Sequence, residues 1–263
     1  VKNPLYWDKD RVKLEVVDAY AVKSETTSLN MYLNGQLDWA TVMPPATIPV
    51  LKQKFPEQFR GAPELTTYFY RCNVTRPELK DPRVRRALAM AIDKRRICEQ
   101  VTRAGELPAA GLVPPIPGYQ GPAGLPFDPI EAKKLLAEAG YPEGQGLPAI
   151  QILYNDLDVH RTIAETIQQM WRENLGVDSE LRGLEWGVYL ASTHKLDFEV
   201  ARAGWVADYA DPNTVLDMGQ TKNENNQTGW GNTKYDDLIK SAAAEEDAAK
   251  RLKLLSEAET ILI

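Results

Sequence analysis

The sequence has few of the side chains that usually build metal and catalytic sites. Among 263 residues it has two cysteines and two histidines, and these do not cluster. Because a zinc site draws most of its ligands from Cys and His, a protein-ligated zinc is not expected. Cys72 lies in a strand-like run and Cys98 in a helical one, which fits two small buried side chains. The sequence leaves open whether they form a disulfide.

Long apolar runs and dense basic tracts are also absent. No stretch of about 18 apolar residues occurs, so no membrane-spanning helix is predicted. A net charge of −6 with scattered Lys and Arg argues against nucleic acid or an anionic membrane as the main partner. The chain begins at Val1 without a recognisable signal sequence and ends within a helical pattern. We therefore expect a fragment of a longer protein.

The hydrophobic period alternates between that of strands and that of helices. This alternation predicts an α/β fold. The expected strands cover 12–22, a stretch after Gly35, 63–75, 148–155, 178–185 and part of 197–212. The expected helices cover the segment before Gly35, 81–101, 130–142, 159–177, 185–196 and two segments within 235–263. Proline and glycine in 106–129 predict an extended surface loop.

The run DFEVARAGWVADYADP, residues 197–212, carries an unusual pair of charges. Arg202 and Asp208 interrupt an otherwise apolar strand pattern. Strand alternation would place residues 202, 204, 206 and 208 on one face. One cation and one anion on the same face of an apolar strand are not expected from packing alone.

Four motifs then resemble a known family. These are NPLYWDKDRVKLEVV, NVTRPELKDPRVRRALAMAIDK, FDPIEAKKLLAEAGYPEG and, above all, VARAGWVADYADP. They resemble the periplasmic peptide-binding proteins of ABC importers, the family-5 extracellular solute-binding proteins, and the last motif is similar to the oligopeptide-binding branch. The resemblance covers essentially the whole chain.

The resemblance implies a periplasmic-binding-protein type II-like lobe, a mixed sheet flanked by helices, present as a fragment of a larger two-lobe protein. Residues 1–65 would be a partial, hinge-connected first lobe, and residues 66–263 a second lobe without its C-terminal return strands. The implied function is substrate binding for a peptide importer, without enzymatic activity or cofactor. The implied partners are an oligopeptide and an inner-membrane permease with its ATPase. The protein would be a periplasmic or lipoprotein-anchored monomer.

The resemblance also implies roles for particular residues. The ligand would lie extended and pair its backbone with a strand, which grips any sequence because main-chain groups are the same in every peptide. Each charged end of the peptide would need a counter-charge in a closed cleft. The implied contacts are the backbone of Gly204, Trp205 and Val206, Asp208 for the ammonium, Arg202 and His160 for the carboxylate, and Trp186 in a side-chain pocket.

Each of these residues has a structural alternative. Asp208 could begin a turn, where Asp is common. Arg202 could pair with a neighbouring structural acid, and His160 could face solvent at a helix start. Trp186 could be a core aromatic. Packing is also the simplest reading of Tyr209 and of the Trp205 side chain.

One position departs from the family pattern. Some members have a lysine where this chain has Thr102, so the carboxylate-binding set is thinner and the preferred peptide length is in doubt. Arg103 next door could substitute, but adjacent residues on a helix point in different directions.

Other functions are compatible with the same residues. An enzyme could use Asp208, His160 and Asp156 as acid and base, yet no nucleophile motif or phosphate loop accompanies them. A protein of the same fold could carry a dipeptide, a nickel complex or an oligosaccharide, although the pair of Arg202 and Asp208 favours a zwitterionic peptide. A sensory module would need an appended DNA-binding domain.

Overall fold

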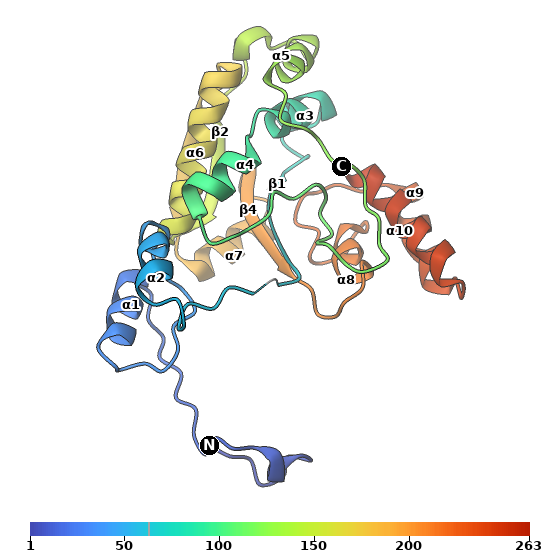
Figure 1. The fold of residues 1–263 in the computed structure, drawn as a ribbon. Helices are drawn as coiled ribbons and strands as arrows, with labels where there is room; N and C mark the ends of the chain where they lie inside the picture. The colour runs from blue at the N-terminus through green and yellow to red at the C-terminus, as the bar shows by residue number, and fades with distance from the viewer. Residues whose placement is uncertain (63) are drawn as a thin grey trace.

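A four-stranded mixed sheet forms the centre of the molecule (Figure 1). The computed structural model describes residues 1–62 and 64–263. The strand order is β1-β4-β2-β3, in which β2 runs parallel to β3 and β4, and β1 runs antiparallel to β4. The strands are β1 (Thr66–Cys72), β2 (Ile150–Asn155), β3 (Ser179–Leu184) and β4 (Val200–Val206). The predicted mixed sheet is therefore present.

Three amphipathic helices cover one face of this sheet. They are α3 (Pro82–Met90), α5 (Pro129–Glu138) and α6 (Asp158–Leu175). Their buried side chains pack against β2 and β4 in one core. This core includes Leu88, Leu136, Ile152, Ile167 and Val200. Each fully buried aliphatic side chain contributes about 1.5–3 kcal/mol.

Helix α7 (Trp186–His194) lies on the opposite face. Its Tyr189 packs in a small core with Leu153 of β2 and Ala201 of β4. Because Val200 and Ala201 belong to different cores, β4 is covered on both faces along its first half.

The C-terminal helices build a separate core beside the sheet (Figure 1). They are α8 (Asn213–Leu216), α9 (Thr233–Ala244) and α10 (Ala248–Leu262). Buried Glu259 of α10 accepts the backbone N–H groups of Leu112 and Val113 and the hydroxyl of Tyr119. These bonds fasten the predicted extended loop to α10.

The N-terminal region contains α1 (Glu25–Leu33) and α2 (Ile48–Lys54). Two predictions fail here, because residues 12–22 and the stretch after Gly35 are irregular. A strand needs a backbone partner, and no other strand lies beside these segments in the part of the chain that the structure describes. Alternation alone could not reveal that.

The helix predicted over 81–101 is interrupted. Helix α3 ends at Met90, and α4 (Lys94–Arg96) then continues as a π-helical segment, Ile97–Thr102. Asp93 causes the restart, since its carboxylate accepts the Arg96 backbone N–H at 3.0 Å as a helix N-cap. Short 3-10 turns lie at Lys9–Arg11, Pro45–Thr47, Pro77–Leu79, Pro142–Gly144 and Asp217–Gly219.

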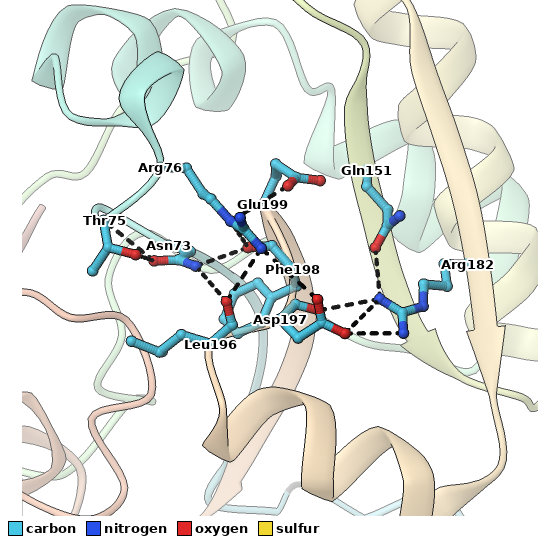
Figure 2. A network of polar contacts seen from close by, with 9 residues as sticks. All are labelled: Asn73, Thr75, Arg76, Gln151, Arg182, Leu196, Asp197, Phe198 and Glu199. Carbon is cyan, nitrogen blue, oxygen red and sulfur yellow. Dashed lines mark hydrogen bonds and ion pairs between the residues drawn. The ribbon is translucent and has the colours of Figure 1, made fainter.

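A polar network fixes the segment that leads into β4 (Figure 2). Asn73 donates to the carbonyls of Leu196 and Phe198 at 2.9 and 2.8 Å. Arg182 pairs with Asp197 at 3.1 Å. The entry to β4 is therefore held by side chains from β3 and from the end of β1.

Candidate functional site

Strand β4 extends beyond the end of its neighbour β2. Strand β1 pairs with β4 along its whole length, from Thr66↔Val206 to Cys72↔Val200. Strand β2 pairs with it only at Ile152↔Val200 and Leu153↔Ala201. From Arg202 onward, one edge of β4 has no strand beside it among residues 1–62 and 64–263.

The register shows which backbone groups face this edge. Hydrogen bonds from Ala207 to Leu65 and from Asn73 to Glu199, both 2.8 Å, bracket the β1–β4 ladder. Because bonded pairs alternate in an antiparallel ladder, residues 201, 203 and 205 direct their backbone groups toward β1. Residues 202, 204 and 206 direct theirs toward the other edge, where the Arg202 carbonyl accepts the Tyr189 hydroxyl. The N–H and C=O groups of Gly204 and Val206 therefore face the open edge. Those of Trp205 face β1, which corrects the expectation that the Trp205 backbone contacts the ligand.

Arg202 lies beside this edge, on the face of the sheet covered by α6. Its guanidinium carbon is 4.8 Å from the centroid of the Tyr68 ring. One terminal nitrogen donates to Asn155 Oδ1 at 3.3 Å, and the buried Nε has no hydrogen-bond partner in the described structure. No carboxylate of residues 1–62 or 64–263 forms an ion pair with it. The alternative of a structural acid partner is therefore wrong.

His160 is 7% exposed in the first turn of α6. Its Nδ1 is 3.3 Å from the Tyr68 hydroxyl. Burial, reinforced by the positive charge of Arg202, lowers the pKa of His160 to about 4. The imidazole is therefore neutral near pH 7, and the alternative of a solvent-facing histidine is wrong. The structure brings His160 and Arg202 together around one tyrosine.

Tyr68, Tyr70 and Asn155 were not predicted as members of this site. The Tyr68 and Tyr70 hydroxyls are 3.5 Å apart, and burial raises the pKa of both phenols. Alternation in TTYFYRC already places both tyrosines on one face of β1. The register that sets Tyr68 opposite Gly204 and Tyr70 opposite Arg202 was not readable from the sequence.

Asp208 lies outside the strand, which corrects the prediction that it shares a face with Arg202. Strand β4 ends at Val206, and Asp208 is exposed in the following loop. Its Oδ2 accepts a hydrogen bond from the hydroxyl of buried Thr214 at 3.2 Å. The backbone N–H of Asp208 donates to the Thr214 hydroxyl oxygen at 3.1 Å. A second loop acid, Asp211, pairs with Arg251 of α10 at 2.6 Å. The loop that carries Asp208 is thus anchored just beyond the open edge.

Trp186 starts α7 and is 52% exposed, so it is not a core residue. Its ring stacks on Tyr189 with centroids 5.5 Å apart. Since Tyr189 donates to the Arg202 carbonyl, Trp186 is connected to β4. Trp205 is half-buried and its Nε1 has no partner in the described structure, whereas Tyr209 is 54% exposed.

Thr102 and Arg103 do not join this group. The Thr102 hydroxyl donates to Glu106 at 2.8 Å, and Arg103 Nε donates to the Gln100 carbonyl at 3.0 Å. Cys72 and Cys98 are both free. Across the described residues, no group of three or more His, Cys, Asp or Glu side chains could hold a metal ion. No helix of this part of the chain could cross a bilayer.

Comparison with known proteins gives consistent matches. The family model of bacterial extracellular solute-binding proteins, family 5, matches residues 1–227. The oligopeptide-binding protein OppA of Bacillus subtilis is 35% identical over 275 residues, covering 100% of this chain and 50% of the relative. The dipeptide-binding protein DppE of the same organism is 38% identical over 273 residues, covering 100% of this chain and 49% of the relative.

A solved structure has the same fold. A periplasmic oligopeptide-binding protein from Borrelia burgdorferi matches with a TM-score of 0.89 and 35% identity, over 98% of this chain and 52% of that one. The predicted fold class and the family resemblance are thereby confirmed. The chain spans about half the length of the curated relatives that it matches.

Proposed function

Because the chain belongs to the bacterial extracellular solute-binding proteins of family 5, we propose that it serves as the substrate-binding component of an ABC-type peptide importer. It holds an extended oligopeptide along the open edge of β4. The observation that carries this proposal is that β4 extends beyond the end of β2. The backbone groups of Gly204 and Val206 on that edge therefore have no neighbouring strand in the described structure.

The ligand backbone supplies the missing strand. A peptide laid beside Gly204 and Val206 exchanges main-chain hydrogen bonds with them, whatever its side chains are. Gly204 has no side chain, so the ligand approaches closely at that point. The backbone groups of Trp205 face β1, so they are used within the sheet. This arrangement predicts broad sequence tolerance combined with a strict requirement for a peptide backbone.

The ends of the peptide meet opposite charges. Arg202 has no acidic partner in the described structure, and its planar fork suits a carboxylate. His160 contacts Tyr68, over which Arg202 also lies. His160 and Arg202 together bind the C-terminal carboxylate. Asp208, exposed in the loop after β4, accepts the α-ammonium group. Trp186 lines the pocket of one ligand side chain.

The wider biological setting follows from the same proposal. Residues 1–65 belong to a first lobe and residues 66–263 to a second, and the two close on the peptide. The loaded protein, a monomer in the periplasm or anchored outside the membrane, delivers the peptide to a permease with its ATPase. It performs no chemistry on the peptide.

A second cargo class has a specific observation in its favour. DppE, which is 38% identical to this chain, is named as a dipeptide-binding protein. A dipeptide also has two charged ends, so the roles of Arg202 and Asp208 would be unchanged. A nickel complex or an oligosaccharide uses these charges less well.

Identification of the bound cargo tests this proposal. The whole gene product is purified under native conditions, and mass spectrometry then identifies the small molecules released on denaturation. Peptides of two or more residues support the proposal, and their length separates the two cargo classes. A sugar or a metal complex as the main cargo contradicts it. Incubation with added peptide should leave the peptide mass unchanged, because cleavage would indicate an enzyme.

A further inference from the structure

A second arginine lies next to the site on the other face of the sheet. Arg71 of β1 is opposite Ala201, and the preceding residue, Tyr70, is opposite Arg202. Because successive strand residues point to opposite faces, Arg71 and Arg202 project to different sides. Arg202 is on the α6 side, so Arg71 is on the side covered by α7.

Arg71 has polar contacts but no counter-charge. Its Nη1 donates to Gln227 Oε1 at 2.6 Å, and its guanidinium carbon is 5.8 Å from the Phe69 ring centroid. Its Nε is buried and lacks a hydrogen-bond partner among the described residues. None of the ion pairs found in that part of the chain includes Arg71.

Other arginines near β4 are neutralised. Arg76 Nε lies 3.4 Å from Glu199, and Arg182 pairs with Asp197 at 3.1 Å (Figure 2). A half-buried cation without such a partner is unfavourable in the free protein. Burial, and next the charge of Arg202, lowers the pKa of Arg71, which is the expected response of an uncompensated cation. The arginine remains protonated at neutral pH.

Tyr189 connects Arg71 with the open edge. Its hydroxyl donates to the Arg202 carbonyl, and its ring stacks on Trp186. Tyr189 also raises the pKa of Arg71, against the larger lowering by burial. In an extended ligand, successive side chains also alternate between the two faces of the sheet. A ligand side chain directed to the α7 face therefore lies on the side of the sheet that carries Trp186, Tyr189 and Arg71.

Building on the peptide-binding function proposed above, we propose that Arg71, held by Gln227, forms the end of a side-chain pocket that selects an aspartate or glutamate side chain of the peptide. The fork of an arginine binds a carboxylate through two parallel hydrogen bonds, and the unpartnered Nε is one of the donors available. The peptide's terminal carboxylate is assigned to Arg202 on the opposite face, so the two carboxylates do not compete.

The test compares tripeptides that differ only in Glu or Gln at one position, each position in turn, by calorimetry on the whole gene product. At one position the Glu peptide should bind at least about tenfold more tightly, which corresponds to about 1.4 kcal/mol. Arg71→Gln should reduce this ratio to near one, and Arg71→Lys should restore part of it. Arg86→Gln, which removes an exposed charge from α3, should leave the ratio unchanged.

Amidated versions of the same peptides identify the carboxylate involved. The Glu preference should persist after amidation, because it depends on the side chain. The proposal is overturned if the wild-type protein shows no Glu preference at any position, if Arg71→Gln keeps the preference, or if amidation alone removes it. The wild-type comparison decides the question even if Arg71→Gln fails to fold. Binding of trialanine checks the proposed function separately, since it needs the open edge but not Arg71.

Discussion

The guanidinium of Arg202 lies over the ring of Tyr68, with 4.8 Å between the guanidinium carbon and the ring centroid. Tyr68 is also opposite Gly204 in the β1–β4 ladder. The stacking therefore holds an unpaired cation beside the open backbone edge. A cation–π contact contributes about 0.5–2 kcal/mol, and it orients the guanidinium without neutralising its charge.

Replacing Arg202 should affect peptides with a free C-terminus most. Arg202→Gln removes the charge-assisted bond to the carboxylate, which contributes roughly 1.5–3 kcal/mol. Calorimetry on the whole gene product should show a dissociation constant at least about tenfold larger for free-acid peptides. C-terminally amidated peptides serve as the control and should lose much less. Equal losses for both would remove Arg202 from the carboxylate site.

Protonation of His160 should destabilise the free protein in acid. Its folded-state pKa of about 4 lies below the ordinary value of 6.5, so the unfolded state binds the proton more readily. The stability contribution is present above pH 6.5 and is lost as the pH falls toward 4. The loss is roughly 2–3 kcal/mol.

Urea denaturation of the free protein between pH 7 and pH 4 measures this effect. His160→Gln should lose less stability over that range than the wild type. His194→Gln is the matched control, because His194 is exposed, and it should follow the wild type. A steeper loss in His160→Gln would contradict a neutral, buried His160.

Asp208 should contribute to binding only when the ligand has a free amino end. Asp208→Asn keeps an acceptor for the Thr214 hydroxyl but removes the charge. Peptides with a free N-terminus should weaken by roughly 1.5–3 kcal/mol, and N-acetylated peptides should change little. If calorimetry gives the same change for both ligands, the ammonium is held elsewhere.

Glu259 should be a major contributor to stability, although it lies away from the site. It is 1% exposed and accepts three hydrogen bonds from the 112–119 loop. Glu259→Gln keeps one acceptor oxygen but places an amide donor where acceptors are needed, which should cost roughly 1–3 kcal/mol in the free energy of unfolding. Glu257→Gln, on the exposed side of the same helix, should change it little. Equal denaturation midpoints for both variants would contradict this role.

The sequence predicted the elements better than their partners. The strand around Val200–Val206 and the helices near it follow from local periodicity, and these are present. The strand predicted over 12–22 fails because a strand depends on a neighbour that periodicity does not describe. The prediction of one continuous helix over 81–101 is wrong because Asp93 caps a new helix within a continuous apolar pattern.

The candidate site was predictable only in part. Arg202, Asp208 and Trp186 were selected because they depart from local patterns or match a family motif. Tyr68 and Arg71 were not selected, since an aromatic and a charge on a strand are unremarkable until the register with β4 is known. The open edge itself depends on where β2 ends relative to β4, which is a tertiary relationship.

The most direct test of the account is the response of binding to N-methylation of the ligand. A tripeptide series is measured by calorimetry on the whole gene product at one pH and salt concentration, with each amide methylated in turn and each side chain replaced in turn. Methylation of the amide that faces Gly204 and Val206 leaves a carbonyl of β4 without its donor, so it should weaken binding at least about tenfold. Apart from the acidic position assigned to Arg71, side-chain replacements should change the dissociation constant by less than that. If every N-methylated peptide binds as well as its parent while ordinary side-chain replacements abolish binding, the edge of β4 does not pair with the peptide.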